Sequence, residues 1–171
     1  AMGRPAMQSD PLGQALYYSY DANGNRTRRV DANGQVTTFS YDALNRLIGI
    51  DYPGSADDST FAYDPTGNVI RASNANVTVE YAYDLLRRPT HVTVTLTSPA
   101  VTRAIRYTYN PDGSRATMTD PDGGVTRYEY NANGWLTAIV NPFGERVTNT
   151  YDAAGRLIRR DLGNGAYVTY T

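Results

Sequence analysis

Hydrophobic and polar residues alternate along short stretches of this chain. The clearest stretch is residues 91–97, HVTVTLT, in which Val92, Val94 and Leu96 alternate with His91 and three threonines. Alternation with a period of two is typical of a β-strand that turns one face inward and the other toward water. The polar side of that strand carries His91, which is therefore expected to be a surface residue. The pattern predicts β-structure throughout.

A tyrosine followed by Asp or Asn is the anchor of a longer repeat. Successive anchors lie 21, 22, 20, 26, 21 and 21 residues apart, and Tyr170 begins a further unit 19 residues after the last of them. A fixed period of this length is typical of a repeat architecture. The anchor pairs are Tyr20-Asp21, Tyr41-Asp42, Tyr63-Asp64, Tyr83-Asp84, Tyr109-Asn110, Tyr130-Asn131 and Tyr151-Asp152.

A second aromatic residue precedes most anchors by two positions. A spacing of two places both rings on one face of a strand. These residues are Tyr18, Phe39, Phe61, Tyr81, Tyr107 and Tyr128, and Asn149 breaks the series. If the rings stabilise the sheet through cross-strand packing, Asn149→Tyr is expected to leave the stability unchanged or to raise it.

Each anchor leads into a segment with turn chemistry. An Asp or Asn at the first position of a turn can bond to backbone two residues on, and Gly or Asn accepts the positive φ that follows. The fourth residue after the anchor is Gly24, Asn45, Gly67, Gly113, Gly134 or Gly155, and in one unit Arg87. The combination predicts a hairpin loop with a glycine bulge, in which Gly113, Gly134 and Gly155 have positive φ.

The same turn signal recurs halfway between anchors, at 31–34, 120–123 and 141–144, with looser versions at 52–54, 74–76 and 161–165. Each unit of about 21 residues is therefore predicted to be two antiparallel strands of about seven residues. Two DANG tetrapeptides, at 21–24 and 31–34, mark the ends of one strand over 25–30. The whole chain is predicted to be an all-β, long antiparallel β-meander of about 15 short strands in about seven repeats. Sheets of more than about ten strands curl or split, so this sheet is expected to curl.

Three units in particular resemble a known repeat: YDALNRLIGIDYP (41–53), YDPTGNVIRASN (63–74) and YDAAGRLIRRDLGNG (151–165). They are similar to the YD repeat of Rhs proteins, of TcC-type components of insecticidal toxin complexes and of teneurins. Seven units in register make the resemblance specific. It implies a sheet that spirals into a hollow cocoon, which in bacterial members encloses a C-terminal toxin. It also implies a secreted or cell-surface location within a larger bacterial protein.

The repeat array is expected to cover residues 16–171, as a fragment of a longer shell. Residues 1–15 are interpreted as an N-terminal extension, because the opening AMGRPAM resembles a remnant of cloning. No apolar run approaches the roughly 18 residues of a membrane-spanning helix. No membrane segment is therefore expected.

Composition narrows the possible partners. The chain has 15 tyrosines and a net charge of -1, from 16 basic and 17 acidic residues, so nothing in its charge favours nucleic acid. The absence of cysteine excludes disulfides and thiolate metal sites. All basic residues are arginine. Those near the turns, Arg46, Arg88, Arg115 and Arg156, are expected either to lie against the tyrosine rings or to be solvated.

No catalytic, cofactor or metal site is expected. His91 is the single histidine, and no recognisable motif places a serine or an acid beside it. The DANG segments depart from the spacing of a calcium loop. Residues 120–124, DPDGG, resemble the DPxGL-type motif at which Rhs proteins cleave themselves, but they lie within the array and no leucine follows. The chain is therefore expected not to be an enzyme.

The leading interpretation is a structural shell fragment that encloses and helps deliver a C-terminal toxin or cargo polypeptide. Its partners are then the remainder of the parent shell and the enclosed cargo. The alternative is a cell-surface binding module that recognises carbohydrate through Tyr- and Arg-rich sheet faces. Self-association is also expected, because edge strands near 17–20 and 167–170 lack the lysine or proline that protects natural sheet edges.

Overall fold

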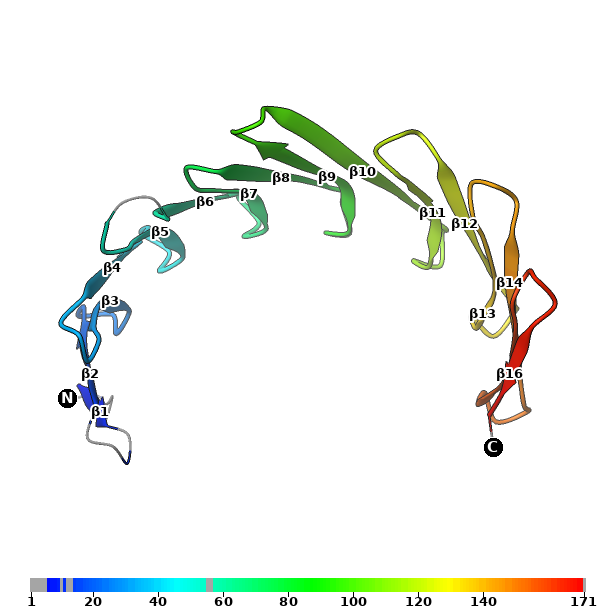
Figure 1. Ribbon diagram of the computed structural model, residues 1–171, viewed down its shortest axis with the longest axis horizontal. Coiled ribbons are helices and arrows are strands. Elements are labelled where there is room, and N and C mark those ends of the chain that lie inside the picture. Colours follow the sequence, from blue (N-terminus) through cyan, green and yellow to red (C-terminus); the bar gives the residue numbers. More distant parts are fainter. Residues whose placement is uncertain (1–5, 10, 12–13, 55–56, 171) are drawn as a thin grey trace. The chain divides into compact units, whose positions relative to one another are not determined.

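A computed structural model describes residues 6–9, 11, 14–54 and 57–170. These residues form sixteen strands in one sheet, and the strands follow one another across the sheet in chain order (Figure 1). The predicted all-β antiparallel meander is confirmed, with sixteen strands instead of about fifteen. Within the described ranges, no helix is long and apolar enough to cross a membrane.

Most strands are five or six residues long, shorter than expected, because the bulged turns take up more of each repeat. The strands are β1 (Met7–Ser9), β2 (Ala15–Tyr20), β3 (Arg26–Val30), β4 (Val36–Tyr41), β5 (Leu47–Asp51), β6 (Ser59–Tyr63), β7 (Val69–Ser73), β8 (Val77–Tyr83), β9 (Pro89–Leu96), β10 (Val101–Tyr109), β11 (Arg115–Thr119), β12 (Val125–Tyr130), β13 (Leu136–Val140), β14 (Arg146–Tyr151), β15 (Leu157–Asp161) and β16 (Tyr167–Thr169). The longest hairpin, β9–β10, belongs to the unit with the 26-residue spacing.

The sheet begins inside the segment interpreted as an N-terminal extension. Strand β1 pairs with β2 in antiparallel register, with Met7 opposite Tyr17 and Ser9 opposite Ala15. The strand over 17–20, which was expected to be an open edge, is therefore covered on one side. The two ends of the strand order are β1 and β16.

The turns have the geometry that their sequences predict. In the turn after Tyr63, the N–H of Gly67 donates to the carbonyl of Asp64 at 3.0 Å, and the N–H of Asp64 donates to the carbonyl of Asn68 at 2.9 Å. The register shifts immediately before the anchor tyrosine in six hairpins, which is the predicted bulge. The predicted positive φ is observed at Gly24 (85°), Gly67 (92°), Gly113 (91°), Gly134 (78°) and Gly155 (82°).

Two anchor turns place a residue other than glycine in the left-handed region: φ is 61° at Asn45 and 62° at Arg87. Arginine pays about 1–2 kcal/mol in this region, whereas asparagine tolerates it. We expect Arg87→Gly to stabilise the protein by about 0.5–1 kcal/mol, and Asn45→Gly to have a smaller effect. Urea denaturation of both variants measures the difference. Equal shifts for the two variants would show that backbone strain at Arg87 is not the cause.

The chain divides into two compact units, Ala1–Tyr81 with Val94–Thr102, and Ala82–Thr93 with Arg103–Thr171. In the first unit, Phe39 lies opposite Ile50 and Phe61 lies opposite Ala72, on one face of the sheet. In the second unit, Tyr128 lies opposite Ile139, which lies opposite Val147. Each unit thus has an aromatic and aliphatic face.

The opposite face of each unit carries Ser, Thr and charged residues. In the second unit it includes Glu129, which lies opposite Ala138, and Thr148, which lies opposite Ala138 on the other side. Among the described residues, Ala138 is the one buried hydrophobic residue, and no large side chain is fully buried. Within the described ranges no second layer covers either face, so the folded state depends on contacts between neighbouring strands within the sheet.

Candidate functional site

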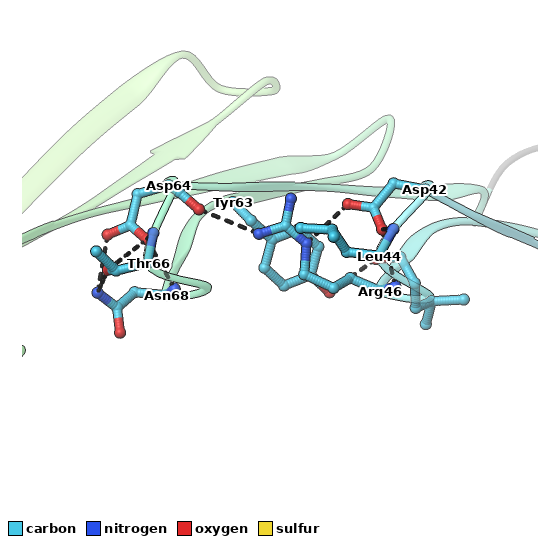
Figure 2. Close-up of polar contacts among 8 residues, drawn as sticks. Asp42, Leu44, Arg46, Tyr63, Asp64, Thr66 and Asn68 are labelled. Atoms are coloured by element: carbon cyan, nitrogen blue, oxygen red, sulfur yellow. Dashed lines mark hydrogen bonds and ion pairs between the residues drawn. The ribbon is translucent and has the colours of Figure 1, made fainter.

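An aspartate and an arginine in one anchor turn make hydrogen bonds within that turn and contacts with the next repeat. Oδ1 of Asp42 accepts hydrogen bonds from the backbone N–H groups of Leu44 and Arg46, each at 2.9 Å. Oδ2 of Asp42 accepts a 2.7 Å bond from Nε of Arg46 (Figure 2). The aspartate therefore closes the turn and also fixes the direction of the arginine.

Arg46 reaches from its own turn to the next repeat. Its guanidinium lies 4.6 Å from the centre of the Tyr63 ring, and its Nη1 donates to the backbone carbonyl of Asp64 at 3.1 Å (Figure 2). The hydroxyl of Tyr63 donates back to the carbonyl of Leu47 at 2.7 Å. We call this set, a turn aspartate with its arginine and the next anchor tyrosine, the repeat joint.

A second repeat joint lies in the second unit. Nε of Arg88 donates to Asp84 at 2.7 Å, and its guanidinium lies 4.2 Å from the centre of the Tyr109 ring. The hydroxyl of Tyr109 donates to the carbonyl of Pro89 at 2.7 Å. The arginine side chains of both joints are 26% exposed, because each lies between its own turn and the next ring. Cation–π contacts of partly desolvated arginines are worth about 0.5–2 kcal/mol each.

A third aspartate–arginine pair lies in the last anchor turn, with less than one repeat of the given sequence after it. Nε of Arg156 donates to Asp152 at 2.7 Å, but the arginine side chain is 81% exposed. In the part of the chain that the structure describes, no ring lies against Arg156. The expectation that turn arginines lie against rings therefore holds for Arg46, Arg88 and Arg115, whereas Arg156 is solvated.

Two arginines lie six residues after their anchor tyrosine, one position further than the joint arginines, and each lies between two rings. The guanidinium of Arg115 lies 4.7 Å from the Tyr107 ring and 5.7 Å from the Tyr128 ring. That of Arg26 lies 5.5 Å and 4.8 Å from the rings of Tyr18 and Phe39. Sequence reasoning missed Arg26, although it occupies the same position relative to its anchor as Arg115 does.

Tryptophan replaces arginine in another joint. Trp135 follows the Asn131 turn, and its ring lies 5.4 Å from that of Tyr151 at an interplanar angle of 44°. The same indole packs onto Gly155, where an added Cβ would come within 2.7 Å of the ring. In these joints the anchor tyrosine therefore meets either a cation or an aromatic ring from the preceding repeat.

Four of the anchor tyrosines share one role that the sequence did not reveal. Their hydroxyls donate to the carbonyl of the first residue of a strand in the preceding repeat. Tyr41 donates to Arg26 at 3.0 Å and Tyr151 to Leu136 at 2.8 Å, as do Tyr63 and Tyr109 in the two joints above. The acceptor always lies six residues after the previous anchor, a spacing that points to contact only once the bulge geometry is known.

The remaining anchors lie at equivalent places. Tyr20, Tyr83 and Tyr130 end β2, β8 and β12 and are half-buried. Desolvation by burial raises the pKa of the Tyr130 hydroxyl. Oδ1 of Asn131 accepts from the N–H of Trp135 at 3.0 Å, and Nδ2 of Asn110 donates to the Ser114 hydroxyl at 2.9 Å. The turn chemistry is therefore kept where Asn replaces Asp.

Asn149 does not behave as a missing aromatic. Its side chain is buried, and its Nδ2 donates to the carbonyl of Leu136 at 3.0 Å. Its Oδ1 accepts from Nε of Arg160, the residue opposite it on β15, at 3.0 Å. From the sequence, Asn149→Tyr was expected to be neutral or stabilising. The structure leads us to expect a loss of stability instead, because the buried amide forms a hydrogen bond at each end.

Hydrogen bonds lower the pKa of several turn aspartates and so favour their charged form. Desolvation alone would raise the pKa of Asp64, but hydrogen bonds from the side chains and backbone N–H groups of Thr66 and Asn68 outweigh it and lower the pKa to about 2. The Arg88 side chain lowers the pKa of Asp84. At Asp42 the largest contribution that lowers the pKa comes from the backbone N–H of Arg46.

These shifts predict how stability depends on pH. A carboxylate with a lowered pKa in the folded state stabilises it fully above its ordinary pKa of 3.8, and this contribution is lost as the pH falls toward 2. We expect the urea midpoint to fall between about pH 4 and pH 2, and to fall less steeply in Asp64→Asn. An identical slope in the variant would contradict the assignment to Asp64.

Taken together, these contacts form a structural site. Asp, Arg and Tyr hold one repeat against the next, and the carboxylates and guanidiniums with shifted pKa values are engaged in turns and ion pairs. The geometry defines a repeat protein whose single sheet is held together by side-chain contacts between successive repeats.

The RHS Repeat family matches residues 1–35, 20–57 and 109–146, which together cover more than half of the chain. The chain therefore belongs to the RHS repeat family. Among curated proteins, the toxin subunit YenC1 of Yersinia entomophaga is 38% identical over 66 residues, which cover 33% of this chain and 7% of that protein.

Solved structures of similar fold come from toxin complexes. The crystal structure of TcdB2-TccC3-Cdc42 matches 99% of this chain with a TM-score of 0.81 and 16% identity. The Tc holotoxin pore of Photorhabdus luminescens matches the same share with a TM-score of 0.80 and 16% identity. This chain covers 10% of each of those chains. It spans a tenth or less of the length of the proteins it matches.

Proposed function

We propose that this chain is a wall segment of a shell that encloses a toxin or other cargo polypeptide of its parent protein and helps deliver it. The observation that carries the proposal is the repeat joint. It lets a single-layer sheet hold together through side-chain contacts between repeats, without a second layer packed on either face. Such a sheet can be extended by adding repeats, and it leaves both faces available for other contacts.

The likeness to toxin subunits supports the same proposal. The partners are then the remainder of the parent shell and the enclosed polypeptide, and the location is outside the producing cell or at its surface. The segment itself serves a structural purpose and catalyses no reaction. Its aspartates, which make up most of its carboxylates, are engaged in turn hydrogen bonds at Asp42, Asp64 and Asp84.

The repeat joints do not favour the alternative of a carbohydrate-binding module. Stacking on a sugar needs a free ring face and free polar groups beside it. Arginines cover the rings of Tyr63 and Tyr109, and the hydroxyls of both tyrosines are bonded to backbone carbonyls.

Protease protection of the parent protein tests the proposal. We expect a polypeptide downstream of the shell to resist protease in the intact parent and to become sensitive when two whole repeats are deleted from this segment. Deletion of two whole repeats keeps the strand order and the turn chemistry of the rest. Equal protection with and without the deletion would show that this segment does not enclose the cargo.

The chain taken alone is expected to self-associate through β1 and β16, the two ends of its strand order. Edge strands carry unpaired backbone N–H and C=O groups that a second copy can satisfy. We expect light scattering to give a mass that rises above 18.8 kDa with concentration, at tens of micromolar and above. A mass that stays constant over the dilution series would contradict this expectation.

A further inference from the structure

A groove of about 270 Å³ lies in the second unit, beside the turns that follow β13 and β15. Its apolar lining comes from Ile139, Val147 and Leu162, and its polar lining comes from Asn141, Glu145 and Asn164. Nδ2 of Asn141 donates to Oε2 of Glu145 at 2.7 Å, which fixes the carboxylate. Among the residues that the structure describes, Glu145 forms no ion pair.

The turn after β8 in the same unit is unlike the other anchor turns. It places Leu85 and Leu86 in water, fully and 69% exposed respectively. Arg87 follows in the left-handed region, with φ of 62°, where other turns have Gly or Asn. The ion pair between Asp84 and Arg88, at 2.7 Å, holds the base of this turn in place. Exposed apolar residues on a rigid support are typical of a contact surface.

We propose that the Leu86–Arg87 turn of one molecule docks into this groove of a second copy. Leu86 then packs against Ile139, Val147 and Leu162, and Arg87 pairs with Glu145. Neither charge has an ion-pair partner among the described residues of its own chain, so the contact provides charge complementarity as well as apolar burial.

The two surfaces differ, so the contact is head-to-tail, and it joins copies into an open chain unless the rotation closes. A single leucine and one ion pair do not offset the entropy lost when two free molecules associate tightly. The contact is therefore weak and reversible on its own. It is independent of edge pairing through β1 and β16, and it does not rest on the proposed shell function.

Disulfide trapping tests the proposal, because the chain has no cysteine of its own. A Leu86→Cys protein and an Asn164→Cys protein are mixed, oxidised mildly and analysed for the heterodimer on a non-reducing gel. The matched control is Leu44→Cys, since Leu44 has the same position in its turn and is 68% exposed, but Asn45 follows it where Arg87 follows Leu86. We expect Leu86→Cys to cross-link several-fold faster than Leu44→Cys.

Charge reversal provides the second arm. Adding Glu145→Arg to the Asn164→Cys protein is expected to slow the cross-link to the rate of the control. Adding Arg87→Glu to the Leu86→Cys partner is expected to restore it. Equal rates for Leu86→Cys and Leu44→Cys, or rates that do not respond to the two reversals, would overturn the proposal.

Discussion

Replacing Gly155 with alanine is expected to destabilise the protein by about 2–4 kcal/mol. Two effects add at this position. The residue has φ of 82°, which costs an L-amino acid about 1–2 kcal/mol. The new Cβ would also lie within 2.7 Å of the Trp135 ring, which packs between Gly155 and Tyr151. To relieve this steric clash, the indole of Trp135 has to move away from Tyr151, which weakens the contact between the two rings.

Gly134→Ala is the matched control for this prediction. Gly134 has φ of 78°, and nothing lies within 4 Å of the position its Cβ would take. Alanine there is expected to cost about 1–2 kcal/mol, from the backbone alone. Urea denaturation gives both free energies of unfolding, and the tryptophan emission reports the movement of Trp135 directly. If both variants lose equal stability with unchanged emission, the contact between Trp135 and Gly155 contributes nothing.

Replacing Asn149 with tyrosine is expected to destabilise the protein by about 2–3 kcal/mol, because two costs combine. The amide bonds to Leu136 and Arg160 are lost, which leaves Nε of Arg160 without its acceptor in a half-buried place. The larger ring must also fit where the asparagine is 8% exposed. The free energy of unfolding from urea denaturation measures the total.

Asn149→Asp separates the two costs. Aspartate keeps an acceptor for Arg160 and nearly the same volume, but it cannot donate to the carbonyl of Leu136. That carbonyl still accepts from the hydroxyl of Tyr151 at 2.8 Å. We therefore expect Asn149→Asp to lose less stability than Asn149→Tyr. A tyrosine variant as stable as the original protein would mean that the space around Asn149 can open at no cost.

The local structure of this protein was predictable from its sequence. An Asp or Asn followed three residues later by glycine specifies a turn through bonds within five residues, and these bonds form the same way wherever the segment lies. The positive φ of Gly113, Gly134 and Gly155 and the antiparallel order of the strands follow from such short-range chemistry. A spacing of two between aromatic residues likewise predicts a shared face, because a strand has a period of two.

The contacts between repeats were decided only by the tertiary structure. Arg46, five residues after its anchor, lies against one ring, whereas Arg115, six residues after its anchor, lies between two rings. Trp135 replaces the arginine, and Asn149 replaces an aromatic with a buried amide bonded at both ends. Each outcome depends on what a side chain meets more than ten residues away in the sequence. By itself the sequence therefore determined the turns and the strand order, which depend on near neighbours, whereas the packing across strands required the three-dimensional positions of all the partners at once.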